Sequence, residues 1–233
     1  MDAVSGIGFD LDHTLAIDNR LERVALLRLL EVLLARGGRT LGTLADEIES
    51  IDALLGRQRH GEFTIDDAIR RFVGEHGLEP DDSYVETFRS SAVAMVDEFV
   101  VPLPGVKRML ETLRRRGIAV AVLSNGWNPL QARKALQAGF EGPVLVSSEI
   151  GERKPQPGAF ELLLQRLGTP PQQTWYVGDD PSVDVAGSQE AGMSAIWINW
   201  ERKEYPQRLA PPRHTILTFD DLLELVVSPV HAP

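Results

Sequence analysis

The chain has 233 residues, no cysteine and a formal net charge of −10 at pH 7. Its length fits one large domain or a core with a smaller insertion, and the lack of cysteine excludes disulfides, thiol nucleophiles and thiolate metal sites. The acidic balance disfavours a nucleic-acid partner, because phosphate backbones attract basic surfaces. We find neither a signal-peptide pattern nor a run of about 20 apolar residues, so we expect a cytoplasmic protein with no membrane partner.

The first predicted element is a short buried strand at 7–9, which leads directly into Asp10 and Asp12. Open α/β sheets build their active sites at the carboxyl ends of such strands. Two carboxylates this close in sequence repel each other and lose solvation, so they require a cation, a proton or a functional reason. The Asp-x-Asp pair is therefore a candidate site.

From about residue 19 to residue 99 the sequence is typical of helices and contains no convincing strand. Glycines close the first predicted helix, and Thr64, followed by two aspartates, opens the third. The periodicity predicts four helices, at 21–34, 43–55, 64–77 and 82–99. Four helices in this length can form a small α-helical bundle.

After a proline-containing connector at 101–105, helical segments alternate with apolar strands at 118–123, 144–146, 174–177, 195–198 and 215–217. This alternation predicts a mainly parallel, doubly wound sheet with helices on both faces, an α/β fold. The strand at 7–9 has no partner before the helical block, so it must join this later sheet. We therefore predict a core domain of 1–17 and 100–233 with an inserted helical domain, 18–99, and a loose tail at 228–233.

Polar side chains follow the predicted strands 118–123 and 174–177, and a lysine precedes a proline between them: Ser124, Asn125, Lys154, Asp179 and Asp184. If the strand ends converge, these side chains meet the Asp-x-Asp pair. Hard oxygen ligands of this kind favour magnesium, which keeps several waters and bridges to a substrate phosphate.

With these motifs the sequence resembles the haloacid dehalogenase-like hydrolase superfamily. Four signatures occur in the order of the family: Asp10-Leu11-Asp12-His13-Thr14, Ser124-Asn125, Lys154 in Lys-Pro-x-Pro, and Gly178-Asp179 with Asp184. The resemblance covers about residues 4–15 and 100–225 and implies a Rossmann-like core. The helical insertion looks like the cap domain that many members carry at this place.

The resemblance implies a division of labour between the first two acids. Asp10 would attack phosphorus and form an aspartyl-phosphate, and Asp12 would protonate the leaving alcohol and later deprotonate the hydrolytic water. Mg2+ would be held by Asp10, the carbonyl oxygen of Asp12 and Asp179.

The remaining motif residues would support this chemistry. By the same resemblance, Ser124, Asn125 and Lys154 would bind the phosphoryl oxygens. Thr14 would support the loop, and Asp184 would orient Lys154 or a metal-bound water. We expect His13 to shape its loop rather than react, and Asp180 to stay outside the inner ligand set.

The implied function is a magnesium-dependent phosphatase of a small phosphorylated metabolite: phosphoglycolate, a sugar phosphate or a nucleoside monophosphate. Asp12 disfavours removal of a halide, because that reaction has no leaving alcohol to protonate. A phosphomutase, which shares all four motifs, is the alternative enzyme. The third alternative, a binding module without catalysis, is disfavoured by the intact acids.

Substrate choice should depend on the helical insertion, since the core recognises only phosphate. The segment 56–61, predicted to be a loop, concentrates donors in an otherwise acidic protein. We hypothesise that Arg57, Arg59 or His60 meets the leaving group of the substrate, although a solvated loop is the equally simple interpretation. Trp127 could line the substrate pocket or merely pack under the helical insertion. The sequence does not indicate the oligomeric state.

Overall fold

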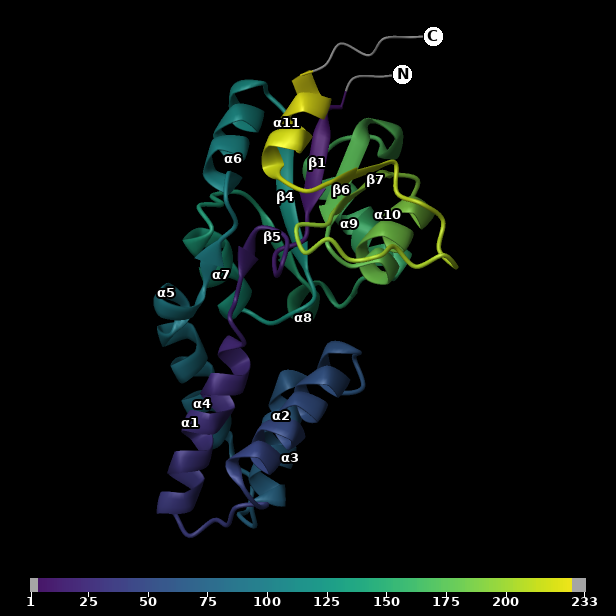
Figure 1. Ribbon diagram of the computed structural model, residues 1–233. Coiled ribbons are helices and arrows are strands. Elements are labelled where there is room, and N and C mark those ends of the chain that lie inside the picture. Colours follow the sequence, from purple (N-terminus) through teal and green to yellow (C-terminus); the bar gives the residue numbers. More distant parts are fainter. Residues whose placement is uncertain (1–3, 228–233) are drawn as a thin grey trace. The chain divides into compact units, whose positions relative to one another are not determined.

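The computed structural model describes residues 4–227, which form two compact units (Figure 1). One unit comprises the described residues up to Asp18 and from Val100 onward, and the other is Asn19–Phe99. The division falls one residue later than the predicted boundary, and Asp18 forms an ion pair with Lys134 inside the first unit. The predicted loose tail, 228–233, lies outside the described residues. Across the described part of the chain, no helix is long and apolar enough to span a bilayer.

Within residues 4–227 the first unit is built on a sheet of six strands, all paired in parallel, in the order β5-β4-β1-β6-β7-β8. The strands are β1 (Gly6–Phe9), β4 (Ala119–Ser124), β5 (Val144–Val146), β6 (Thr174–Gly178), β7 (Ser194–Ile198) and β8 (His214–Ile216). In this register Phe9 of β1 is level with Val122 of β4 and Val177 of β6. The polar residues that follow these strands therefore meet at one edge of the sheet. The predicted fold class is confirmed.

Helices cover both faces of the sheet, as right-handed crossovers require (Figure 1). One face carries α6 (Val106–Arg115), α7 (Leu130–Gln137) and α11 (Phe219–Val227), and the other carries α9 (Pro157–Leu167) and α10 (Ala186–Glu190). Short helical segments fill the connections: α8 (Ser147–Ile150), a 3-10 turn (Pro171–Gln173) and a π-helical turn (Pro181–Val185). The sequence analysis did not predict α11, although Phe219, Leu222 and Leu223 bury one helical face.

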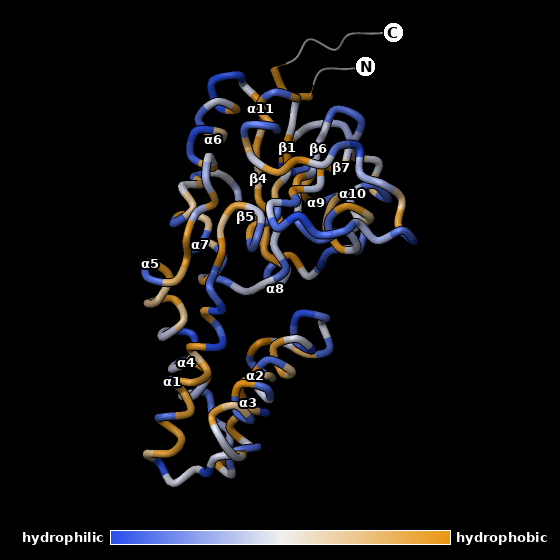
Figure 2. Tube along the Cα trace, in the orientation of Figure 1, coloured by the Kyte–Doolittle hydropathy of each residue, from blue (hydrophilic) through white to orange (hydrophobic). Residues whose placement is uncertain are grey.

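The core of this unit is densest between α9 and the sheet. Leu163 and Phe160 of α9 pack with Tyr176 of β6 and Leu123 of β4. A Cβ on Gly8 of β1 would lie 2.5 Å from the Leu163 side chain, so glycine allows the helix to approach the central strand closely. Strand β4 is mostly orange, the hydrophobic end of the scale, in Figure 2. The central strands β1, β4 and β6 are therefore fixed by close packing against α9.

The second unit is entirely helical within its described residues. It contains α1 (Leu21–Ala35), α2 (Leu44–Arg59), α3 (Ile65–Glu75), α4 (Asp82–Ala94) and α5 (Val96–Phe99). Thr64 accepts a hydrogen bond from the backbone of Asp67, whose carboxylate accepts one in return, so the predicted start of α3 is confirmed as a capping box.

Two predicted boundaries in the helical unit are wrong. Helix α2 continues through Gly56 to Arg59, because the left-handed residue that follows the helix is Gly61, with φ 80°, and not Gly56. The predicted loop at 56–61 is therefore mostly helix. The predicted helix 82–99 is interrupted at Met95, where α4 ends and α5 begins.

The two crossings between the units are joined in a small antiparallel ribbon. Strand β2 (Ala16–Ile17) pairs with β3 (Val101–Pro102), which lies in the connector predicted from its prolines. Beyond this ribbon, within the helical unit, the Asn19 side chain donates to the carbonyl oxygen of Phe99 at 2.7 Å. The chain therefore leaves and re-enters the first unit through adjacent segments.

Candidate active site

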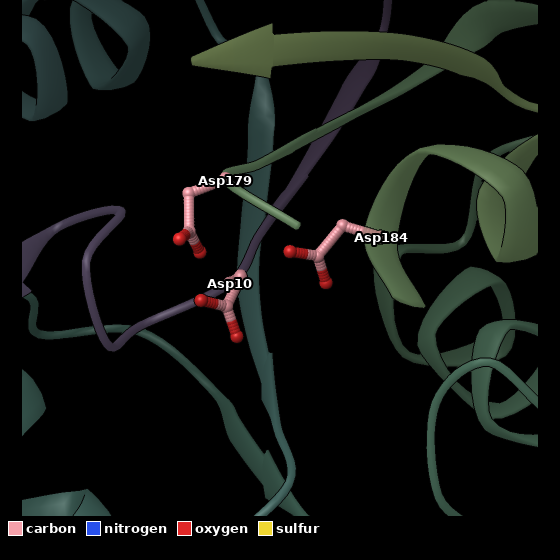
Figure 3. A group of neighbouring side chains, drawn as sticks. All are labelled: Asp10, Asp179 and Asp184. Atoms are coloured by element: carbon pink, nitrogen blue, oxygen red, sulfur yellow. The ribbon is translucent and has the colours of Figure 1, made fainter. Parts of the chain in front are cut away.

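Among the described residues, three carboxylates converge where β1 and β6 end (Figure 3). Asp10 follows β1, Asp179 follows β6, and Asp184 lies in the π-helical turn Pro181–Val185. One oxygen of each lies within 4.8 Å of one oxygen of the others. The Asp10 backbone N–H donates to the carbonyl oxygen of Val177 at 2.9 Å, which ties the residue to β6. The sheet register thus brings together acids that are far apart in sequence.

Asp180 does not join this cluster. Its carboxylate accepts hydrogen bonds from the backbone N–H groups of Ser182 and Val183, at 2.7 and 2.9 Å, and so caps the π-helical turn. Partial burial acts to raise the pKa of Asp180, but a hydrogen bond from the Ser182 hydroxyl, together with these backbone bonds, outweighs it and lowers that pKa. Asp180 therefore stabilises the turn that carries Asp184.

A single buried lysine holds the cluster together. Lys154, only 3% exposed, donates from Nζ to Asp10 at 2.5 Å, to Asp184 at 2.8 Å and to the hydroxyl of Tyr176 at 3.0 Å. The Tyr176 hydroxyl donates in turn to the carbonyl oxygen of Leu123, at 3.1 Å. An ammonium group has three N–H donors, and all three are engaged here, so the position of the lysine is fixed.

The cluster carries more negative charge than its lysine neutralises. Burial raises the pKa of Asp10 to about 7, opposed by Lys154 and reinforced by Asp184. Burial also raises the pKa of Asp179 to about 8, and the neighbouring Asp10 adds to the shift. Burial acts to lower the pKa of Lys154, but the carboxylates outweigh it and keep that pKa well above its usual value. Closely spaced carboxylate oxygens with excess negative charge fit a hard divalent cation such as magnesium.

The side chain of Asn125 contacts the backbone of Lys154. Its amide nitrogen donates to the carbonyl oxygen of Lys154 at 2.7 Å, and its amide oxygen accepts from the Lys154 N–H at 2.9 Å. Because both polar atoms of the side chain are engaged, the amide positions the lysine and does not point to a phosphate. Ser124, at the end of β4, is buried and makes no side-chain hydrogen bond among the described residues. Its hydroxyl remains able to serve a ligand.

Asp12 lies outside the cluster, against helix α7. One carboxylate oxygen accepts from Nζ of Lys134 and the other from the amide nitrogen of Gln131, each at 3.0 Å. The sequence analysis missed both partners, as it missed Tyr176. A usable indication existed for Lys134, since it stands among the apolar residues Leu130 and Ala135 on the buried face of α7.

The residues after Asp12 shape the loop. Thr14 is buried, and its hydroxyl is 3.5 Å from Asp179, which agrees with a supporting role. His13 adopts a left-handed backbone conformation with φ 62°, and its ring is parallel to that of Trp200, 6.4 Å away between centroids. Trp200 also donates from its indole nitrogen to the carbonyl oxygen of His13, at 2.8 Å.

The residues expected to choose the substrate already have partners within their own units. Arg57 pairs with Glu62 at 2.8 Å, and Arg59 lies 3.5 Å from Glu22. His60 ends α2 and donates from Nδ1 to a backbone carbonyl one turn earlier. Trp127 is 2% exposed, which favours the packing interpretation of its side chain.

Comparison with known proteins identifies a matching family and several similar phosphatases. A family model described as haloacid dehalogenase-like hydrolase matches residues 4–192. The chain is 39% identical over 99 residues to a phosphoserine phosphatase from Thermus thermophilus, covering 41% of this chain and 40% of that protein. It is 28% identical to a glyceraldehyde 3-phosphate phosphatase from Methanopyrus kandleri over 84% of each chain. The chain spans about half the length of the first curated relatives, between 40% and 58%.

Solved structures share the fold over nearly the whole chain. A HAD-hydrolase described as putative, YfnB from Bacillus subtilis, bound to magnesium, superposes with a TM-score of 0.73 at 20% identity. The superposition covers 97% of this chain and 100% of that one. 2-Haloacid dehalogenases also occur among the similar structures.

Proposed function

The chain belongs to the haloacid dehalogenase-like hydrolases, and on this premise we propose that it is a magnesium-dependent phosphatase of small phosphorylated metabolites. One observation carries the proposal: buried Lys154 bridges Asp10 and Asp184 beside Asp179, at the end of the strand that also leads to Asp12. Phosphatases and nucleotidases among the curated relatives support the same reaction class.

Asp10 and Asp179, with the backbone carbonyl of Asp12, would hold the Mg2+ ion. When bound, the ion neutralises excess carboxylate charge and draws an anionic phosphate to an anionic nucleophile. The separation of at most 4.8 Å between oxygens of Asp10, Asp179 and Asp184 suits ligands around one ion. Asp184 is engaged with Lys154 and therefore serves to orient that lysine.

Asp10 is the proposed nucleophile. A carboxylate oxygen attacks phosphorus while the bond from phosphorus to the leaving alcohol breaks, which leaves an aspartyl-phosphate on Asp10. Lys154 holds one oxygen of Asp10 and so fixes the direction of attack. Ser124 is the side chain at the end of β4 with a hydroxyl available to a phosphoryl oxygen.

Asp12 is the proposed proton carrier. It gives a proton to the departing alcohol oxygen and later removes one from the water that attacks the aspartyl-phosphate. The bond between phosphorus and Asp10 then breaks, inorganic phosphate leaves and both carboxylates return to their starting state. An acid two residues after the nucleophile has no task in removing a halide, so it favours the phosphatase over the dehalogenase reaction.

Purified protein incubated with Mg2+ and a panel of phosphate esters tests the proposal. The panel holds phosphoglycolate, sugar phosphates and nucleoside monophosphates, together with phosphoserine and glyceraldehyde 3-phosphate, after which relatives are named. We expect magnesium-dependent release of inorganic phosphate, abolished in Asp10→Asn and retained in Asp82→Asn, whose aspartate is exposed. Equal activity in parent and Asp10→Asn would contradict the covalent mechanism. Isomerisation of a sugar phosphate without phosphate release would identify a phosphomutase instead.

Substrate choice is proposed to depend on the helical unit and its donors Arg57, Arg59 and His60. The double variant Arg57→Ala, Arg59→Ala tests this, because it removes two exposed cations, one paired with the exposed Glu62 and the other 3.5 Å from the buried Glu22 of the same unit. We expect altered KM values across the panel with kcat nearly unchanged. An unchanged substrate profile would show that these arginines do not contact the substrate.

A further inference from the structure

Lys134 joins the two ends of the loop that carries the proposed proton carrier. Its side chain projects from α7, is 1% exposed, and donates from Nζ to Asp12 at 3.0 Å and to Asp18 at 2.9 Å. Asp12 begins this loop, and Asp18 is the last residue before the chain enters the helical unit. A buried cation between two carboxylates fixes both of them, since moving either would leave charge uncompensated.

Gln131 lies one turn earlier on α7 and holds the second oxygen of Asp12. Its amide nitrogen donates at 3.0 Å, whereas its amide oxygen is a buried polar atom without a hydrogen-bond partner among the described residues. Turning the amide over would place its oxygen against a carboxylate. Gly126 leaves room for this arrangement, because a Cβ there would collide with the Gln131 side chain. The fold thus tolerates an unpaired acceptor to keep a donor on Asp12.

We propose that Lys134 and Gln131 are positioning residues that fix the Asp12 carboxylate for proton transfer; this inference rests on the phosphatase function proposed above. The side chain of Asp12 is 30% exposed and would otherwise rotate freely in its loop. Gln131 and Lys134, one helical turn apart at positions i and i+3, each donate a hydrogen bond to one of its two oxygens. Proton transfer requires placement within hydrogen-bond reach of the leaving oxygen, and a rigid helix supplies it.

Leaving-group dependence distinguishes positioning from a general structural role. The parent, Lys134→Met, Gln131→Leu and the control Lys107→Met, whose lysine is exposed on α6, are assayed with phenyl phosphate and p-nitrophenyl phosphate. These esters differ little in shape, but phenolate needs a proton far more than nitrophenolate does. For Lys134→Met we expect kcat/KM to fall about 100-fold with phenyl phosphate and about 10-fold with p-nitrophenyl phosphate. Gln131→Leu should show a smaller change in the same direction, and Lys107→Met none.

An equal loss with both esters, or no loss, overturns the inference. Lys134→Arg, which keeps the charge, should restore part of the activity on phenyl phosphate, and failure to do so also counts against it. If Lys134→Met does not fold, the double variant Lys134→Met, Asp18→Asn removes one buried carboxylate charge together with the cation and takes its place.

A crystal structure of the Lys134→Met protein provides a readout independent of activity. We expect the Asp12 carboxylate to leave its position near α7, and an unmoved carboxylate would refute the inference. If the parent hydrolyses no phosphate ester while Asp12 moves in the variant, the proposed function fails but the positioning contact stands. If the parent is active and Asp12 does not move, the positioning inference alone fails.

Discussion

Lys154 and Lys134 are both buried lysines that bridge two aspartates, and they belong to neighbouring stretches of the same unit. Lys154 joins Asp10 to Asp184, whereas Lys134 joins Asp12 to Asp18. Their exposed fractions are 3% and 1%. The two clusters therefore look alike in composition and burial, and what separates them is the balance of charge around each lysine.

The first cluster has a third carboxylate, Asp179, and the pKa values of Asp10 and Asp179 rise to about 7 and about 8, chiefly because of burial. Such excess charge marks a place that accepts a further cation. In the second cluster an amide, from Gln131, takes the place of the third acid. Burying ion pairs contributes little to stability, so we interpret each cluster by its proposed part in the reaction. The excess charge of the first cluster suits a bound cation, and the contacts of the second hold the carboxylate of Asp12 in place.

Removing the first lysine should have the largest effect. In Lys154→Met, two carboxylates, Asp10 and Asp184, lose their common donor and Asp10 is no longer held, so we expect kcat/KM for p-nitrophenyl phosphate to fall about 1,000-fold. Lys107→Met, an exposed lysine of α6, is the matched control and should retain parental kinetics. A loss no greater than that of Lys134→Met would erase the distinction between the clusters.

Asp184 and Asp18, the second aspartate in each lysine bridge, test the same difference between the clusters. Asp184→Asn and Asp18→Asn each remove one charge from a lysine bridge while keeping an acceptor in place. We expect about a 100-fold loss of kcat/KM for Asp184→Asn, because Lys154 also determines the position of the nucleophile, and about a 10-fold loss for Asp18→Asn. Steady-state kinetics on one ester measures both, and equal losses would be inconsistent with separate roles.

Magnesium should stabilise the first cluster only. Ligand binding to the folded state raises the unfolding midpoint, and saturating Mg2+ should shift the thermal midpoint of the parent by about 5 °C. Thermal unfolding with Mg2+ and with a chelator measures the shift. We expect Asp179→Asn to lose it and Asp18→Asn to keep it. A full shift in Asp179→Asn would place the ion elsewhere.

The smallest expected effect concerns the hydroxyl of Tyr176. Tyr176→Phe removes one of three acceptors from Lys154 but keeps the ring against Phe160. We expect about a threefold loss of activity and a decrease of about 2 kcal/mol in the free energy of unfolding, since two buried hydrogen bonds, with Lys154 and with the carbonyl oxygen of Leu123, are lost. Denaturant titration measures the second quantity. A loss as large as that of Asp184→Asn would give the hydroxyl a direct part in the reaction.

Local patterns predicted the parallel sheet, and the resemblance to a known family added the meeting of Asp10, Lys154 and Asp184. Apolar runs that end in acids carry this information, because parallel strands end at one edge whatever their order. The order itself, with β1 between β4 and β6, depends on packing that no local pattern contains. The end of α2 was misplaced because a glycine within a helix resembles one that ends it.

The second cluster was not predicted, because Lys134 and Gln131 lie within helix α7 and not at the end of a strand. Lys134 and Asp12 are 122 residues apart, and nothing in the segment around either residue identifies the other. The contacts of the Asn125 side chain were not predicted for a related reason. A motif shows that an amide is present beside the site, but only the fold shows that both its polar atoms are used by the Lys154 backbone.

The pairing of β2 with β3, continued by the bond from Asn19 to the carbonyl oxygen of Phe99, has a consequence for protein engineering. Because the helical unit begins and ends at neighbouring points, replacing it by a short turn would cost little loop-closure entropy. None of the strands of the parallel sheet would lose a neighbour, since β1 pairs only with β4 and β6. The helical unit is thus exchangeable: a different one could be grafted onto the same ribbon without breaking the parallel sheet.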